Sequence, residues 1–78
     1  MDNNQFHLEE ILFEFVIEGN FVKVMAVDPL TGTEISIVGD RRTSKSTLEN
    51  IATKKLIWVL KRKFEKNKNR HEKKRDLF

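Results

Sequence analysis

The apolar residues between Leu12 and Gly39 recur with a period close to two, and this alternation constrains the fold more than any other feature. A period of two belongs to strands, because a helix would repeat its apolar positions every three or four residues. Two turn signals divide the run. Gly19-Asn20 suits a two-residue hairpin loop that needs positive φ, and Asp28-Pro29-Leu30-Thr31-Gly32 has the residue types of a second turn. We therefore predict three antiparallel strands joined in sequence as a meander.

These turns set a register in which Glu18 faces Phe21 and Asp28 faces Thr33. A slip of one residue would exchange the two faces, so the segregation of side chains tests the register. One face then carries no charge and collects Phe13, Phe15, Ile17, Val22, Val24, Ala26, Ile35 and Ile37. This face is predicted to be the core side of the sheet.

The opposite face, termed the second sheet face, mixes apolar and charged side chains. Its charged and polar members are Glu14, Glu18, Lys23, Glu34 and Ser36, and its apolar members are Leu12, Val16, Phe21, Met25, Val27 and Val38. Six exposed apolar side chains exceed what a small soluble monomer usually shows, so we predict a protein interface here, with a second copy of the chain favoured. The alternative cover is the N-terminal set Phe6, Leu8 and Ile11.

A helix is predicted from Thr47 to Phe64, with Ser46 and Glu49 as a capping box at its start. Its apolar stripe is Leu48, Ile51, Ala52, Leu56 and Val59, bordered by Trp58 and Leu60, and it would cover the uncharged sheet face. The expected fold is thus α+β, a three-stranded antiparallel meander with one C-terminal amphipathic helix packed on one face. Lys55 interrupts the stripe. We expect its stem to pack on the core and its ammonium to reach the sheet edge, toward Asp28 or a helix-side carbonyl, with an interface or a catalytic role as alternatives.

Charge divides the chain into three parts: a loosely ordered segment over 1–11, the domain over 12–64, and a basic tail over 65–78 that is a fraying helix or disordered. Residues 54–75 carry eleven bases and two acids, whereas residues 1–20 carry five acids and no Lys or Arg. Such a tail attracts phosphates, so nonspecific RNA contact is predicted for Lys61, Arg62, Lys66, Arg70, Lys73, Lys74 and Arg75. Against this stands the absence of aromatic residues interleaved with the charge, and a solvated tail that folds back on the acidic segment is the alternative.

The loop Gly39-Asp40-Arg41-Arg42-Thr43-Ser44-Lys45-Ser46 differs from the P-loop pattern only by Ser44 in place of its second glycine. A P-loop needs that glycine and a larger parallel sheet, so nucleotide hydrolysis is not expected. A weaker prediction is an anion site made by Arg41, Arg42 and Lys45 beside the helix N-terminus. The alternative is a polar loop before a capped helix.

The chain has no cysteine and two histidines, which argues against a disulfide framework and a structural metal, and we expect no cofactor. Neither a Ser/His/Asp nor a Cys/His set is present, so we predict a protein that is not an enzyme. No stretch is long and apolar enough for a transmembrane helix or a signal peptide, and a cytoplasmic location is expected.

Residues Phe13 to Leu60 resemble a family of short, uncharacterised alphaproteobacterial proteins, a domain of unknown function. The matching positions include Gly19-Asn20-Phe21-Val22-Lys23-Val24, Thr31-Gly32-Thr33-Glu34, Ile37-Val38-Gly39, and the helix residues Leu48, Ala52, Lys55-Leu56 and Val59-Leu60. The resemblance implies a bacterial cytoplasmic protein and no assigned activity. Our leading functional hypothesis is a non-enzymatic binding or scaffolding module that forms a homodimer or binds another protein through the second sheet face. The alternative is an RNA- or ribosome-associated accessory protein, and an enzyme or nucleotide binder is a remote third.

Overall fold

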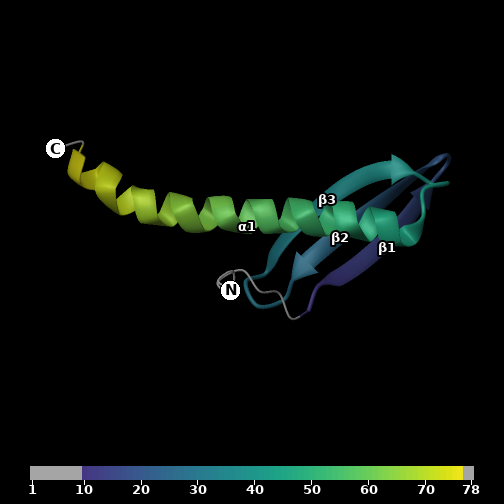
Figure 1. Cartoon of the computed structure of the whole chain (residues 1–78), viewed down its shortest axis with the longest axis horizontal. Helices are drawn as coiled ribbons and strands as arrows, with labels where there is room; N and C mark the ends of the chain where they lie inside the picture. The colour runs from purple at the N-terminus through teal and green to yellow at the C-terminus, as the bar shows by residue number, and fades with distance from the viewer. Residues whose placement is uncertain (1–9, 77–78) are drawn as a thin grey trace.

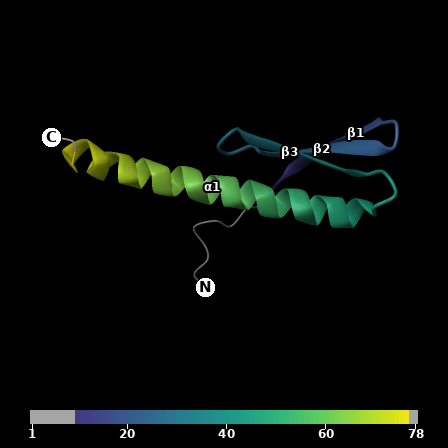
Figure 2. The same ribbon diagram turned by 90° about the horizontal axis from the view of Figure 1, so that it is seen from above.

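The computed structural model describes the backbone of residues 10–76 and the side chains of residues 10–65. Strands β1 (Leu12–Glu18), β2 (Phe21–Asp28) and β3 (Thr33–Asp40) are followed by helix α1 (Lys45–Asp76). The strands form one open sheet in the order β1-β2-β3 with both pairs antiparallel, and α1 runs along one face of it (Figures 1 and 2). The predicted β-β-β-α fold is confirmed. Within the described part of the chain, no helix has the length and apolar character that crossing a membrane requires.

The strand register is the predicted one. Glu18 pairs with Phe21 across the first hairpin, and Asp28 pairs with Thr33 across the second. Both turn glycines have positive φ, 63° at Gly19 and 75° at Gly32, a conformation that costs glycine little because it lacks a Cβ. The two hairpins therefore fix which side chains face α1.

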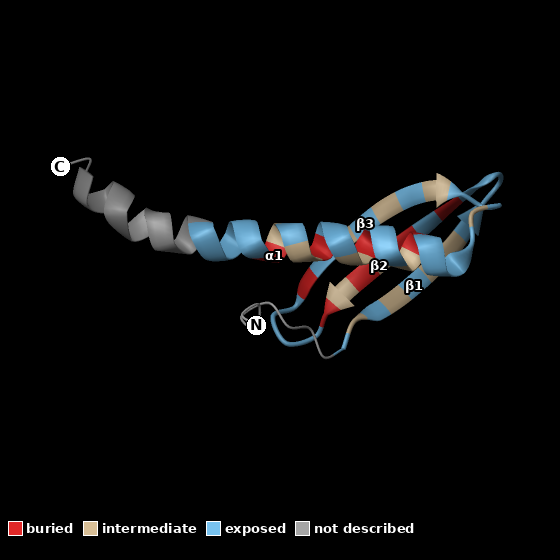
Figure 3. Ribbon diagram, viewed as in Figure 1, coloured by how far each residue is buried: buried red, intermediate tan, exposed pale blue. Residues whose placement is uncertain are grey.

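The core lies between β2 and α1, which carry the buried residues (Figure 3). Seven apolar residues are buried there: Val22, Val24 and Ala26 of β2, and Leu48, Ala52, Leu56 and Leu60 of α1. The helix residues are spaced four apart and form one ridge that packs on β2 and β3. Ile51 was predicted in this stripe, but its side chain is 47% exposed, because the ridge turns position 51 to the flank of the helix.

The predicted start of the helix was wrong. The N-cap is Ser44 rather than Ser46, because the Ser44 hydroxyl accepts a hydrogen bond from the Thr47 amide at 3.2 Å, and the Leu48 amide donates to the Ser44 carbonyl at 3.1 Å. Beyond Phe64, where a fraying helix or disorder was predicted, the backbone of α1 continues as helix to Asp76. Neither glycine nor proline occurs after residue 39, and the lysine, arginine and glutamate that fill this region favour helix without any packing partner.

A chain of polar contacts ties the second hairpin to α1. The carboxylate of Asp28 is buried and accepts hydrogen bonds from the Leu30 amide at 3.2 Å and from the Thr31 hydroxyl at 2.8 Å. Thr31 Oγ1 also lies 2.8 Å from Thr33 Oγ1, and Lys63 Nζ donates to Thr33 Oγ1 at 3.1 Å. Two hydroxyls thus connect a buried carboxylate to an ammonium of the helix.

Lys55 makes a second tie between the helix and the sheet. Its ammonium reaches the sheet edge, as predicted, and donates to the Ser36 carbonyl of β3 at 3.0 Å rather than to Asp28. A lysine on an edge carbonyl obstructs the pairing of β3 with another strand. The interruption of the apolar stripe is therefore explained by the position of α1 over β3.

Candidate functional site

The second sheet face is an apolar surface that the described residues leave open. Leu12, Phe21 and Val38 are 49%, 61% and 68% exposed, and no element formed by residues 10–76 lies over them, because α1 covers the opposite face (Figure 2). The other apolar members of this face, Val16, Met25 and Val27, are half-buried among their neighbours. The register brings all six predicted interface residues together.

The arrangement on this face follows directly from the strand pairing. Met25 lies between Glu14 and Ser36, and the next row along the strands places Lys23 between Val16 and Val38. A shallow hollow of about 380 Å³ lies at the Leu12 end, where Met25 and Val27 form its apolar part and Glu14 and Glu34 its charged part. The face is therefore an apolar surface with acidic borders and one central lysine.

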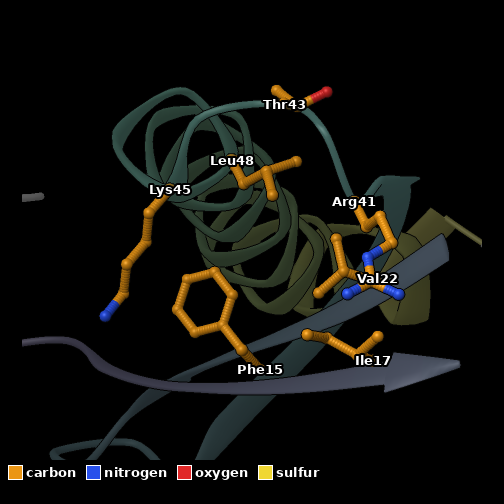
Figure 4. Close-up of a pocket in the computed structure, with 7 residues that line it drawn as sticks. All are labelled: Phe15, Ile17, Val22, Arg41, Thr43, Lys45 and Leu48. Atoms are coloured by element: carbon orange, nitrogen blue, oxygen red, sulfur yellow. The ribbon is translucent and has the colours of Figure 1, made fainter. Parts of the chain in front are cut away.

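The loop before α1 and the helix N-terminus enclose a second hollow of about 390 Å³ on the core side of the sheet (Figure 4). Its apolar floor is made by Phe15, Ile17, Val22 and Leu48, and the side chains of Arg41 and Lys45 stand at opposite sides of it. The Lys45 ammonium lies 5.1 Å from the centre of the Phe15 ring, a cation–π contact. The Thr43 hydroxyl points away from the floor.

Only two of the three residues predicted to bind an anion share this hollow. Arg42 instead forms a bidentate contact with Asp40, with Nε 3.1 Å from Oδ1 and Nη2 3.0 Å from Oδ2. These hydrogen bonds lower the pKa of Asp40 and raise that of Arg42, since each charge favours the other. Arg41 uses Nη1 to donate to the Gly19 carbonyl at 3.1 Å. An anion in this hollow would therefore meet Arg41 and Lys45.

The exposed flank of α1 carries a residue that the sequence reasoning missed. Trp58 was expected at the border of the apolar stripe, but it is 57% exposed, and the Arg62 guanidinium carbon lies 4.9 Å from the centre of its ring. The stated absence of aromatic residues among the basic ones was therefore wrong. The sequence signal for this exposed aromatic residue was the position of Trp58 between Lys55 and Lys61.

The other predicted RNA contacts fall into two groups, because the structure describes side chains only up to residue 65. Lys61 and Arg62 are exposed on the described part of α1. The side chains of Lys66, Arg70, Lys73, Lys74 and Arg75 lie outside the described residues, as do the whole of Phe6 and Leu8. Ile11, the third member of the predicted N-terminal cover, packs against the core cluster instead of the second sheet face.

Across the described stretch, no group of three or more His, Cys, Asp or Glu side chains lies close enough together to hold a metal ion. The arrangements that the structure does present are a broad apolar face, a small hollow with cationic sides, and a basic helix flank with an exposed aromatic ring.

Comparison with known proteins places the chain in an uncharacterised family. No curated protein and no solved structure matches it. A family described as "Domain of unknown function (DUF6898)" matches residues 8–63, which include all three strands and the part of α1 that packs on the sheet. The resemblance to an uncharacterised domain over Phe13 to Leu60 is thereby confirmed. The chain belongs to the DUF6898 family of domains of unknown function.

Proposed function

We propose that this chain is a non-enzymatic binding module that pairs with a second copy of itself through the second sheet face, in the bacterial cytoplasm. The observation that supports this most is the exposed apolar surface opposite α1, where Phe21 and Val38 are more than half exposed. Exposed apolar side chains are costly in water. Those of the second sheet face do not contribute to the core, because the buried cluster lies wholly on the face that α1 covers.

A second copy would also compensate for the small hydrophobic core of the single chain. A domain of this length buries a small fraction of its surface on folding, so its net stability is only about 3–5 kcal/mol without disulfides or metals. Seven buried apolar residues are a small core, and pairing two sheets face to face at about 10 Å would add a second one. Self-association therefore supplies stability as well as covering the face.

The charges of the face fit a two-fold pairing. A two-fold axis that crosses the strands between the rows of Lys23 and Met25 would place Val27 over Phe21 of the partner subunit. The same axis would bring Lys23 within one row of the partner's Glu14, so that the one base of the face meets an acid. An axis along the strands would place the two lysines together and is disfavoured.

The test is the mass of the protein in solution, measured by light scattering. We expect a dimer for the wild type, and monomers for Met25→Lys and Val16→Glu, because each variant places a charge in the middle of the buried surface. Leu30→Glu is the matched control, since Leu30 is 83% exposed in the second turn and lies off the face, and it should remain dimeric. A wild type that stays monomeric at high concentration would refute the proposal. Circular dichroism would verify that the monomeric variants remain folded.

A further inference from the structure

Trp58 has no evident structural reason to be exposed on α1. It is the chain's one tryptophan, more than half of its side chain is in solvent, and the core ridge of the helix does not include it. Arg62, one turn further along, stacks on its ring. A large aromatic side chain held by an arginine and open to water is typical of a surface that binds a planar or cationic group.

The charge around Trp58 excludes a cation as its ligand. From residue 53 to residue 65 the helix carries five bases and one acid, Glu65. Two of the bases are directed to the sheet, since Lys55 donates to the Ser36 carbonyl and Lys63 to the Thr33 hydroxyl. Lys54 is exposed one turn before Trp58. The flank thus presents Lys54, Trp58 and Arg62 in succession, about 6 Å apart along the helix axis.

We propose that this flank of α1 binds single-stranded nucleic acid, with a base stacked on the Trp58–Arg62 pair and phosphates held by Lys54 and Arg62. Every base has a π-face that can stack on an indole ring, and guanidinium planes stack on bases in the same manner. The positive charge supplies attraction for the backbone without reading sequence. Stacking requires an unpaired base, which is why a single strand is favoured over a duplex.

An anionic membrane is the other surface that a basic helix with a tryptophan can meet, but the neighbours of Trp58 argue against it. A helix that lies on a membrane needs a continuous apolar face. Here the positions four residues before and after Trp58 are Lys54 and Arg62, and Ile51 is the one exposed aliphatic residue on the same flank. Insertion of Trp58 would carry charged groups into the acyl region.

The single tryptophan makes the proposal directly measurable. Titration of the full chain with an oligouridylate should quench the Trp58 fluorescence, because stacking brings the base into contact with the indole ring. Inorganic polyphosphate of the same total charge should leave the fluorescence unchanged, since it has no bases. Quenching by both would show that charge alone is responsible and would overturn the proposal. A blue shift with anionic phospholipid vesicles, together with no response to the oligonucleotide, would replace it with the membrane.

Variants separate stacking from charge. In anisotropy measurements with a labelled oligouridylate, Trp58→Leu should weaken binding by about 5- to 150-fold while leaving the salt dependence unchanged, and Trp58→Phe should restore part of the loss. Lys54→Gln should instead lower the slope of log K against log salt by about 0.7. Arg42→Gln is the matched control, because it removes a base from the loop before α1, away from the Trp58 flank and from the second sheet face, and should leave the affinity unchanged. Equal binding by wild type and Trp58→Leu would refute the proposed stacking of a base on the Trp58–Arg62 pair.

Discussion

Gly39 offers the most direct test of how closely α1 approaches the sheet. Gly39 lies in β3, beneath the first turn of the helix, and pairs with Val22 of β2; a Cβ added at Gly39 would lie 2.6 Å from Leu48 Cδ2. That separation is far inside van der Waals contact, so the tip of the Leu48 side chain must shift, either toward the hollow that it lines or together with the helix. The glycine therefore permits the helix to pack where it does.

The substitution Gly39→Ala is expected to destabilise the protein by a small net amount. Overpacking of a buried contact costs about 1–3 kcal/mol. The lower entropy of the unfolded alanine chain offsets about 0.4–1 kcal/mol of that. The net loss of about 0–2.6 kcal/mol should lower the melting temperature by about 4–8 °C for each kcal/mol in a domain of this size.

A double-mutant cycle with Leu48→Val identifies the cause. Valine has no Cδ2, so in that background Gly39→Ala should be neutral or slightly stabilising, and the two substitutions should couple by about 1–3 kcal/mol. The measurement is urea denaturation followed by far-ultraviolet circular dichroism at one fixed protein concentration. If Gly39→Ala costs the same free energy in both backgrounds, the contact with Leu48 is not the reason for the glycine.

Three further predictions concern single polar groups. Asp28→Ala removes a buried acceptor from two donors and should cost about 1–3 kcal/mol in thermal denaturation, and a change under about 0.5 kcal/mol would contradict that role. Ser44→Ala should cost about 0.5–2 kcal/mol by the same assay and Ser46→Ala less than about 0.5 kcal/mol, and the reverse order would return the N-cap to Ser46. The pKa of Asp40 is lowered below its ordinary value of 3.8, so its pairing with Arg42 stabilises the fold above that value and ceases to do so as the pH falls through the lower, folded-state pKa. Arg42→Gln should therefore lower the melting temperature slightly at pH 7, and the difference should shrink as the pH falls below 3.8; a difference that stays the same as the pH falls would show that the pair is not responsible.

The sheet could be predicted from the sequence because its information is local. Gly19 and Gly32 mark the turns, and once two hairpin turns are fixed, the period of two assigns every side chain from Leu12 to Val38 to a face. The six residues of the second sheet face follow from that register alone. How far each of them is exposed within residues 10–76 required the structure, because the degree of exposure depends on tertiary packing.

The helix was harder to predict because its position depends on tertiary contacts. Both Ser44 and Ser46 satisfy the sequence rules for an N-cap, and the choice depends on where the loop after β3 lets the helix begin. The apolar stripe predicted at 100° per residue is wider than the ridge of buried helix residues that packs on the sheet. For this reason Ile51 was assigned to the core and Trp58 to the border of the stripe, although both residues are exposed. The bond from Lys63 to Thr33 joins residues thirty positions apart and has no local signal.

The two proposals make a joint prediction, because the second sheet face and the Trp58 flank lie on opposite sides of the sheet. A dimer formed through the second sheet face would carry two Trp58–Arg62 platforms on its outer sides. An oligonucleotide of about 30 nucleotides could then contact both, whereas one of about 5 nucleotides could contact only one. Linked sites gain avidity of about 10²- to 10⁴-fold when the ligand can span them. Met25→Lys should therefore weaken binding of the long oligonucleotide and leave that of the short one unchanged, as measured by anisotropy. Equal loss for both lengths would mean that the substitution disturbs the platform itself, and no loss for either would mean that each chain binds nucleic acid alone, whatever its state of association.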